Sequence, residues 1–239
     1  MFGEKKYICY NDFMKNLYND KTVIIFDFDG TLCDTRKNII IAFRATMERL
    51  GLDMRDEATC GATIGLTLHD GFKAMYPTMS DAEAAHCVDT YREIFAERRR
   101  ELIPPLFPNV REVLTELHAR GFILTIASSR LYDSIMLFLR EHGIEELFSY
   151  VVGSDSVIHH KPHPEPVLMT LKALDVSADD AIVVGDMPLD VAMGRGAGVR
   201  TVAVTYGNAT REELEAAEAD FVIDSFDMFI GCVERVGWL

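Results

Sequence analysis

The stretch Val23–Thr35, VIIFDFDGTLCDT, begins with four apolar residues and contains three acidic residues among the nine that follow. The apolar residues suit a buried strand, whereas Asp27, Asp29 and Asp34 lie at its end or in the turn beyond. A carboxylate at the mouth of a hydrophobic core is costly unless something compensates its charge. The stretch therefore predicts a core strand that delivers Asp27 and Asp29 to a site able to compensate them.

Short apolar runs that end in polar turns recur along the chain: Phe122–Ala127, Tyr150–Val152, Ala181–Val184, Thr201–Val204 and Phe221–Ile223. Apolar residues at helical spacing lie between them, as in the groups Val110, Val113, Leu114, Leu117 and Val167, Leu168, Leu171, Leu174. Strands that are apolar throughout and alternate with helices indicate a parallel sheet covered on both faces. The predicted fold class is α/β, with a Rossmann-like doubly wound parallel sheet as the core.

The segment from residue 37 to residue 104 breaks this alternation, because it shows helical patterns and no convincing strand. One helix begins around Ile39, and Ser80 with Glu83 forms the pattern of a capping box at the start of another. The pair Pro104-Pro105 ends the segment. We predict an inserted all-helical cap domain at 37–104, a discontinuous core formed by 1–36 and 105–239, and at most a short helix within residues 1–20.

Composition narrows the possible functions of this 239-residue chain. A net charge of −14 argues against nucleic-acid binding, which needs clustered Lys and Arg. The five cysteines are scattered without a CxxC pair, so neither a zinc site nor a disulfide framework is indicated. The first residues lack the apolar stretch of a signal peptide, and no apolar run reaches membrane-spanning length. We expect a cytoplasmic monomer or homodimer with no membrane or nucleic-acid partner.

Polar side chains are expected to meet beyond the carboxyl ends of the parallel strands, where open α/β sheets bind ligands. Asp27 and Asp29 are two residues apart, so on an extended chain they can point the same way. Later segments contribute further polar residues, which are Ser128, Ser129, Lys161, Asp186 and Asp190. A hard divalent cation compensates such carboxylates and usually works with a phosphate ligand, and we expect this cation to be Mg²⁺.

Four ordered motifs resemble those of the haloacid dehalogenase-like superfamily: D-F-D-G-T at 27–31, the strand-terminal Ser128, Lys161 in K-P-H-P-E-P-V, and G-D-M-P-L-D at 185–190. The resemblance implies that Asp27 is a nucleophile that forms an aspartyl-phosphate and that Asp29 is the general acid and base. It implies Mg²⁺ held by the Asp27 carboxylate, the Asp29 backbone carbonyl, Asp186 and Asp190. The phosphate-binding residues that it implies are Thr31, Ser128, Ser129 and Lys161.

Single residues narrow the reaction that the resemblance implies. Dehalogenating members lack an aspartate at the position of Asp29, and phosphonate hydrolases have alanine there, so hydrolysis of a phosphate ester or anhydride is favoured. Sugar-phosphate mutases of similar layout carry a histidine where this chain has Asn38-Ile39, which argues against a mutase. The expected activity is that of a Mg²⁺-dependent phosphatase with a small phosphorylated substrate such as phosphoglycolate.

Two alternatives to a phosphoglycolate phosphatase stay open. The KPxPEPV loop is shared with related pyrophosphatases, and a nucleotide or sugar-phosphate phosphatase of the same superfamily is a further possibility. A non-catalytic phosphate-binding regulatory protein is less favoured, because the nucleophile and acid positions are intact. Fold similarity alone does not fix a substrate. Specificity is expected from the cap and its linkers, where the candidates are Arg36, Lys37, Arg44 and the loop Thr63–Leu68.

Other residues near the motifs have simpler explanations. Asp34 is expected to cap the following helix rather than to act in catalysis. Asp190 could be an acid in the first turn of a helix, although its spacing from Asp186 favours a functional role. A transition-metal site is the weaker interpretation of the histidines in the proline-rich loop, which are His159, His160 and His163.

Overall fold

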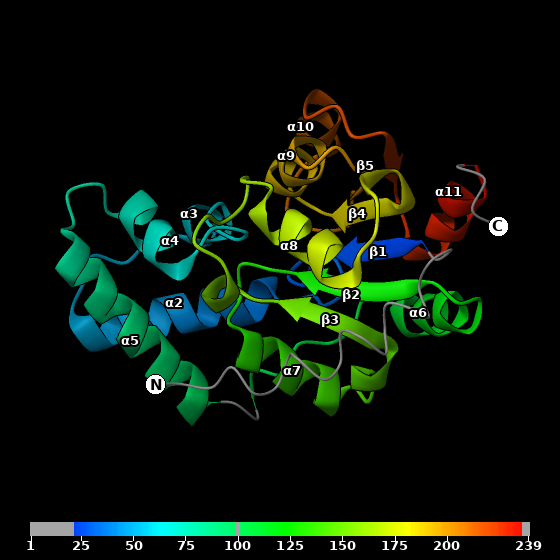
Figure 1. Cartoon of the computed structure of the whole chain (residues 1–239). Helices are drawn as coiled ribbons and strands as arrows, with labels where there is room; N and C mark the ends of the chain where they lie inside the picture. The colour runs from blue at the N-terminus through cyan, green and yellow to red at the C-terminus, as the bar shows by residue number, and fades with distance from the viewer. Residues whose placement is uncertain (1–21, 99–100, 236–239) are drawn as a thin grey trace, which may run out of the picture.

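The computed structural model describes residues 22–98 and 101–235 and confirms the predicted α/β fold. Its centre is a sheet of six parallel strands in the order β3-β2-β1-β4-β5-β6 (Figure 1). The strands are β1 (Val23–Phe26), β2 (Ile123–Ala127), β3 (Phe148–Val152), β4 (Ala181–Gly185), β5 (Arg200–Val204) and β6 (Phe221–Ile223). The strand order reverses at β1, which pairs with both β2 and β4, and such a switch point is where ligands bind in open α/β sheets.

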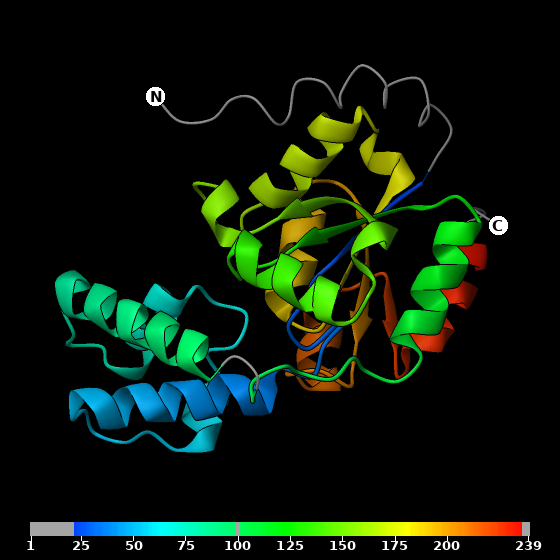
Figure 2. The ribbon, with the colours of Figure 1, turned by 90° about the horizontal axis from the view of Figure 1, so that it is seen from below.

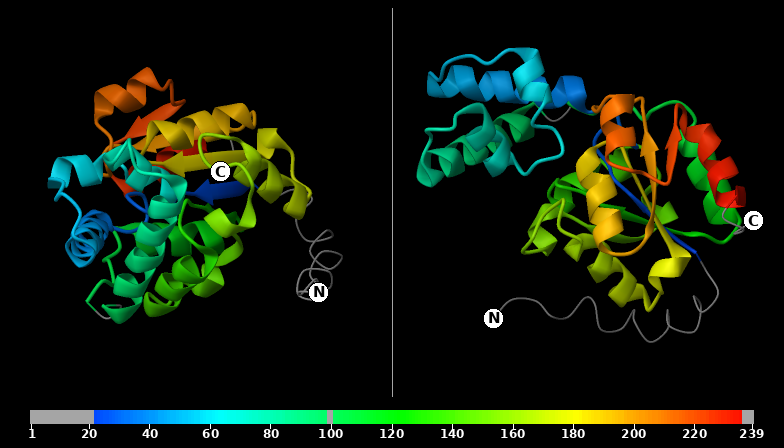
Figure 3. Two further views of the ribbon diagram at one scale, coloured as in Figure 1. Left: turned by 90° about the vertical axis from the view of Figure 1, so that its left-hand side faces the viewer. Right: turned by 90° about the horizontal axis from the view of Figure 1, so that it is seen from above.

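Helices cover both faces of the sheet, as Figures 1 and 3 show. One face carries α6 (Val110–Ala119), α7 (Tyr132–Glu141) and α11 (Phe229–Arg235), and the other carries α8 (Glu165–Leu174), α9 (Pro188–Gly196) and α10 (Arg211–Ala216). Short 3-10 turns join several elements: η1 (Glu145–Leu147), η2 (Ser154–Ser156), η3 (Ala178–Asp180) and η4 (Phe226–Met228).

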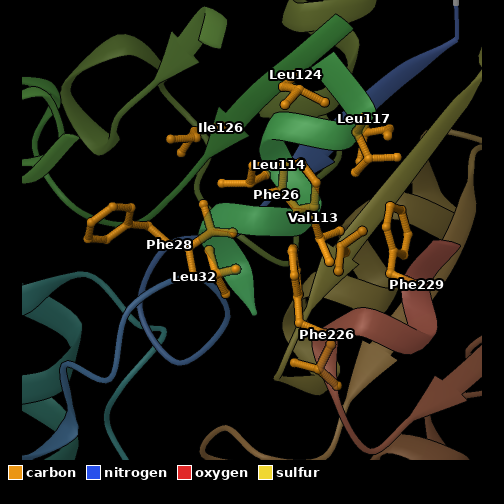
Figure 4. Packing of buried hydrophobic residues seen from close by; sticks show 14 of the residues in the cluster. Phe26, Phe28, Leu32, Val113, Leu114, Leu117, Leu124, Ile126, Phe226 and Phe229 are labelled. Atoms are coloured by element: carbon orange, nitrogen blue, oxygen red, sulfur yellow. The ribbon is translucent and has the colours of Figure 1, made fainter. Parts of the chain in front are cut away.

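Alternate residues of β1 enter two different hydrophobic clusters. Ile24 and Phe26 pack with side chains of α6, α7 and α11, whereas Val23 and Ile25 pack with side chains of α8 and α9. Figure 4 shows the first cluster, in which the Phe26 ring lies 5.7 Å from that of Phe226 between centroids. All four β1 residues are fully buried, which explains why the strand has no polar position.

The chain between β1 and α6 folds into helices, which we call the helical insertion. Its helices are α2 (Arg36–Leu50), α3 (Glu57–Gly61), α4 (Leu68–Met75) and α5 (Asp81–Glu97), and Figure 2 shows them as a group beside the sheet. They enclose a hydrophobic cluster of their own, where the Phe43 ring contacts the rings of Phe72 and Tyr91. The predicted capping box is present at the start of α5, with Ser80 and Glu83 bonded reciprocally.

The chain enters and leaves the insertion through two adjacent segments. The Asp34 N–H donates to the Pro105 carbonyl at 2.9 Å, and the Phe107 N–H donates to the Leu32 carbonyl at 3.0 Å. Cys33 and Leu106 form an isolated antiparallel bridge between these bonds. The two ends of the insertion are therefore held together at the edge of the core.

One prediction about this junction is wrong. Helix α2 begins at Arg36 with Thr35 as its N-cap, and Asp34 is exposed and does not cap it. Thr35 is itself in a helical backbone conformation and its side chain makes no capping bond, so the first turn of α2 has no side-chain cap. The short helix suggested within residues 1–20 lies outside the described residues. Among the helices of residues 22–98 and 101–235, none has the length and apolarity needed to cross a membrane.

Candidate functional site

A buried ion cluster lies beyond the carboxyl end of β1. Asp27 follows β1 directly, Lys161 comes from the loop between β3 and α8, and Asp190 comes from the first turn of α9. The Lys161 Nζ lies 2.6 Å from Asp27 Oδ1 and 2.6 Å from Asp190 Oδ1. All three side chains are almost fully buried, so water screens these interactions little. One ammonium thus joins two of the predicted carboxylates.

Asp186, which follows β4, completes the acidic part of the cluster. Its Oδ1 accepts a hydrogen bond from Thr31 Oγ1 at 3.1 Å, and its Oδ2 accepts from the Asn208 backbone at 2.7 Å and from the Asn208 side chain at 2.9 Å. Gly30, with φ +88°, packs directly against this carboxylate, because a Cβ there would lie 2.2 Å from Asp186 Oδ2. Glycine is required at that position by both the backbone conformation and the close approach.

Burial makes the negative charges of this cluster costly. It raises the pKa of Asp186 to about 7, and the nearby Asp190 carboxylate adds to the effect. Burial also raises the pKa of Asp27; the Lys161 ammonium opposes this shift, whereas the other carboxylates reinforce it. Burial alone would lower the pKa of Lys161, but Asp190 and Asp27 raise it, so the ammonium stays charged. The cluster contains three carboxyl groups and one cation, which contacts two of them, so negative charge in this cluster exceeds positive charge.

This excess fits a divalent cation. Asp27, Asp186 and Asp190 each offer a carboxylate oxygen, and these oxygens lie within 4.8 Å of one another. All three residues are buried, which distinguishes them from a solvated acidic patch. Hard oxygen ligands at the end of a parallel sheet suit Mg²⁺, whose charge would offset what Lys161 leaves uncompensated. The Asp29 side chain does not join this group.

Asp29 instead faces a second cation, Arg130. The Arg130 Nη2 lies 2.7 Å from Asp29 Oδ1, and Nε lies 3.1 Å from Oδ2, which makes a bidentate ion pair. The third guanidinium nitrogen, Nη1, donates to Ser134 Oγ at 3.0 Å. Asp27 and Asp29 thus lie at the same edge of the sheet, as expected from their spacing, but each has its own partner.

The two predicted serines follow β2 and face different surroundings. Ser128 is buried, and its Oγ accepts a hydrogen bond from the Arg130 backbone N–H at 3.3 Å. Ser129 Oγ donates at 2.6 Å to the carbonyl of Gly65, which belongs to the helical insertion. The Ser129 hydroxyl therefore links the core directly to the loop before α4.

A cavity of about 330 Å³ lies between the core and the helical insertion. The core contributes Asp29, Ser129 and Arg130 to its wall, and the insertion contributes residues 64–68 of the predicted specificity loop Thr63–Leu68. The other specificity candidates, Arg36, Lys37 and Arg44, do not line it. Arg36 instead donates to Asn208 Oδ1 at 3.2 Å, so it supports a residue that binds Asp186.

The loop that carries Lys161 is fastened by Glu165, at the start of α8. The Glu165 carboxylate accepts backbone hydrogen bonds from Ile158 and His159, both at 2.9 Å, and these bonds help to lower its pKa to about 2. Of the three histidines considered as metal ligands, His159 and His163 gather with Glu165, whereas His160 lines the cavity. Glu165 and His159 thus have a structural role, because their hydrogen bonds hold the loop that carries Lys161.

Comparison with known proteins agrees with this geometry. The family model for haloacid dehalogenase-like hydrolases matches residues 24–204. The chain belongs to the haloacid dehalogenase-like hydrolase family. It is 35% identical over 218 residues to "Probable phosphatase IndB" of Dickeya dadantii, covering 90% of this chain and 95% of that protein. It is 31% identical over 201 residues to the pyrophosphatase PpaX of Bacillus cereus, covering 84% of this chain and 91% of that protein.

A solved structure of a haloacid dehalogenase-like hydrolase from Bacteroides fragilis has the same fold. It superposes with a TM-score of 0.83 at 29% identity and covers 88% of this chain and 100% of that one. That whole chain thus superposes on most of this one.

Two residues of this haloacid dehalogenase-like site escaped the sequence analysis. Asn208 follows the apolar run of β5, so the rule that finds polar residues after strands would have found it had it been applied there. Arg130 directly follows the predicted Ser128-Ser129 pair, but nothing in the sequence indicates that it pairs with Asp29. Side-chain direction in a loop depends on packing that composition does not reveal.

Proposed function

We propose that the protein is a Mg²⁺-dependent phosphatase that hydrolyses a small phosphorylated metabolite through an aspartyl-phosphate on Asp27. The observation that carries this proposal is the buried carboxylate of Asp27, bonded to Lys161 and grouped with Asp186 and Asp190 at the switch point of the sheet. Family membership and the phosphatase and pyrophosphatase names of its relatives support it.

The acidic group has the composition of a Mg²⁺ site. The side chains of Asp27, Asp186 and Asp190 and the backbone carbonyl of Asp29 would hold the ion. When bound, Mg²⁺ supplies positive charge that offsets the charge on a phosphoryl group during transfer. Thr31 and Asn208 keep Asp186 oriented for this role through their hydrogen bonds.

The chemistry would proceed in two steps on this chain's own residues. In the first, an oxygen of Asp27 bonds to phosphorus while the bond from phosphorus to the leaving oxygen breaks, and Asp29 gives that oxygen a proton. In the second, Asp29 takes a proton from water, the water oxygen bonds to phosphorus, and Asp27 is released. Phosphate and an alcohol, or two phosphates, are the products.

The remaining predicted residues would bind the phosphoryl group. Lys161 already lies beside the nucleophile, and Ser128 and Ser129 come from the adjacent strand end. The Lys161 charge and the Ser128 hydroxyl would neutralise and orient the phosphoryl oxygens. The Thr31 hydroxyl already donates to Asp186 and the Ser129 hydroxyl already donates to the Gly65 carbonyl, so a phosphate contact from either residue would have to come from its other atoms.

The helical insertion, residues 37–104, would serve as a cap that limits the size of the substrate. A cavity of about 330 Å³ fits a small metabolite. Phosphoglycolate is one candidate, and inorganic pyrophosphate is the second because the chain is 31% identical to a pyrophosphatase. An intact set of catalytic residues weighs against a regulatory protein without turnover. The four described cysteines are free, which fits a reducing cytoplasm.

Phosphate release from purified protein tests this function. With Mg²⁺, a panel of phosphoglycolate, pyrophosphate, small sugar phosphates, nucleotides and an aryl phosphate should include substrates, and a chelator should abolish turnover. Asp27→Asn should be inactive with every substrate. Turnover that persists in chelator, or in the Asp27→Asn variant, would contradict the nucleophile and metal assignments.

A further inference from the structure

Arg130 occupies an unusual position for a residue outside the predicted motifs. Its side chain is 10% exposed, and it binds Asp29, the proposed proton donor, through two of its nitrogens. A guanidinium carries five N–H groups, and the bonds to Asp29 and Ser134 use three of them. The other two N–H groups have no partner within the described parts of the chain, so donors remain for a ligand.

Three aromatic rings lie around this guanidinium. The Arg130 Cζ lies 5.2 Å from the Phe138 ring centroid, 5.5 Å from that of Phe95 and 6.0 Å from that of Phe28. Phe95 belongs to α5 of the helical insertion, so Arg130 lies where the insertion meets the core. Rings on several sides keep water away and leave the guanidinium less solvated, which strengthens its attraction for an anion.

The charges around the cavity favour Arg130 as its anion-binding group. The described residues that line the cavity include two arginines, Arg130 and Arg92, and two carboxylates, Asp29 and Asp155. Asp155 already accepts a hydrogen bond from the Tyr132 backbone N–H. Arg92 is on α5 of the insertion, and its side chain is 47% exposed, so it is more strongly hydrated than Arg130. Of these two arginines, Arg130 alone combines burial with contact to a proposed catalytic residue.

The ion pair also limits what Asp29 can do. Both oxygens of its carboxylate accept hydrogen bonds from Arg130, so neither is free to approach a leaving group. An anion that binds the remaining N–H groups shares the guanidinium charge and weakens its hold on Asp29. A substrate that brings such an anion would therefore loosen the proposed acid at the moment when it is needed.

We propose that Arg130 binds a second anionic group of the substrate, and that the preferred substrates are small phosphate esters or anhydrides carrying a further carboxylate or phosphate. This inference rests on the proposed phosphatase function and restricts its substrate class. Phosphoglycolate and pyrophosphate both belong to that class, whereas phosphate esters of neutral alcohols do not.

A pair of non-hydrolysable ligands tests the inference without turnover. Phosphonoacetate and ethylphosphonate have the same chain length, but only the first carries a carboxylate. Calorimetry in the presence of Mg²⁺ should give wild type about ten- to hundredfold tighter binding of phosphonoacetate, the effect of hydrogen bonds to a charged group. The matching kinetic pair is phosphoglycolate and ethyl phosphate, for which the ratio of kcat/KM should show the same preference.

Variants of the two arginines of the cavity locate this preference. Arg130→Gln should bring the ratio of the affinities for phosphonoacetate and ethylphosphonate close to one. Arg130→Lys keeps a positive charge but lacks the paired N–H groups of the guanidinium, so it should give an intermediate ratio. Arg92→Gln should keep the wild-type ratio. If Arg130→Gln does not fold, the Lys variant decides, because an unchanged ratio there excludes a role of the guanidinium.

The inference is overturned if wild type binds the two phosphonates equally, if the ratio survives in Arg130→Gln, or if Arg92→Gln is the variant that loses it. Failure of the phosphatase function has a different signature, because wild type would then release no phosphate from either ester. If an inactive protein still preferred phosphonoacetate over ethylphosphonate, the anion site would be supported and the phosphatase function would not.

Discussion

Lys161 and Asp27 are 134 positions apart in the sequence, yet the Lys161 Nζ lies 2.6 Å from Asp27 Oδ1. The same nitrogen lies 2.6 Å from Asp190 Oδ1. Asp186, the third carboxylate of the group, is bound only by neutral donors among the residues that the structure describes. Among the described residues, the Lys161 ammonium is therefore the cation that directly compensates Asp27 and Asp190.

Lys161→Met should destabilise the metal-free protein severely. The change leaves Asp27 and Asp190 buried without their cation, and breaking a buried ion pair in this way costs about 3–5 kcal/mol. Urea unfolding in chelator measures the loss, and saturating Mg²⁺ should recover part of it. Lys73→Met, which removes a partly exposed pair with Asp81 and a hydrogen bond to the Met79 carbonyl, is the control and should cost much less than Lys161→Met. Equal losses in the two variants would contradict the buried-cluster account.

Asp27→Asn should abolish turnover and leave the fold intact. The amide keeps the shape of the side chain and an oxygen for Lys161, while one negative charge leaves the crowded site. In chelator the variant should melt at the same temperature as wild type or higher. Mg²⁺ should shrink or reverse the difference, because wild type binds the ion more tightly. A variant that melts well below wild type in chelator would make Asp27 a structural residue.

The pKa of Asp186, raised to about 7, predicts a pH dependence with a definite sign. Between about pH 4, where an unfolded aspartate ionises, and pH 7, the folded state keeps a proton that the unfolded chain has lost. The contribution of Asp186 to the stability of the metal-free protein therefore falls as pH rises through this window. The difference in unfolding free energy between wild type and Asp186→Asn, measured in chelator at several pH values, should show this slope.

Mg²⁺ should reverse that dependence. The ion competes with the proton for Asp186, so its affinity should rise with pH up to about 7, and binding at pH 6 should release protons. Calorimetry in two buffers of different ionisation enthalpy counts these protons. Binding without proton release at pH 6 would show that Asp186 is already ionised in the metal-free protein.

Gly30→Ala should disturb the site more than its backbone conformation alone explains. Gly30 has φ +88°, and a Cβ there would lie 2.2 Å from Asp186 Oδ2 and 2.3 Å from Asn208 Nδ2. Gly121, with φ +89° and nothing within 4 Å of its Cβ position, is a matched control. Gly121→Ala should cost about 1 kcal/mol from backbone strain alone. Gly30→Ala should cost more and also weaken Mg²⁺ binding, and similar behaviour of the two variants would refute the close-approach argument.

Substrate size should reflect the helical insertion. If it acts as a cap, phosphoglycolate, pyrophosphate and small sugar phosphates should be hydrolysed with higher kcat/KM than any phosphopeptide, because closure excludes water and large groups. Competing assays with one phosphopeptide set and one metabolite set measure the preference. A phosphopeptide with the highest kcat/KM would show that the insertion does not restrict access.

Hydrophobic patterning predicts the core of this protein well because burial on both faces leaves a simple signal. The strands β1 and β6 have the predicted bounds, and β2, β4 and β5 differ by one residue at one end. β3 begins two residues earlier than predicted, at Phe148, because its first residues are only partly buried and Ser149 interrupts the apolar run.

The sequence predicts which residues gather at the candidate site better than it predicts which side chains bind one another. Asp27, Asp186 and Asp190 meet because parallel strands place their carboxyl ends at one edge. The pairing of Asp29 with Arg130, the contact of Ser129 with Gly65 and the absence of a cap at Asp34 all depend on loop conformation. Loops are set by long-range packing, so residue spacing alone could not have predicted these contacts.

The paired hydrogen bonds between Asp34 and Pro105 and between Leu32 and Phe107 make the helical insertion a module. Because its two ends are adjacent, a short linker could rejoin the core across them without moving any strand. Helices can therefore be gained, lost or exchanged at this point while the buried charged side chains of the core stay in place. Substrate choice and phosphoryl chemistry can then evolve at different rates within one chain.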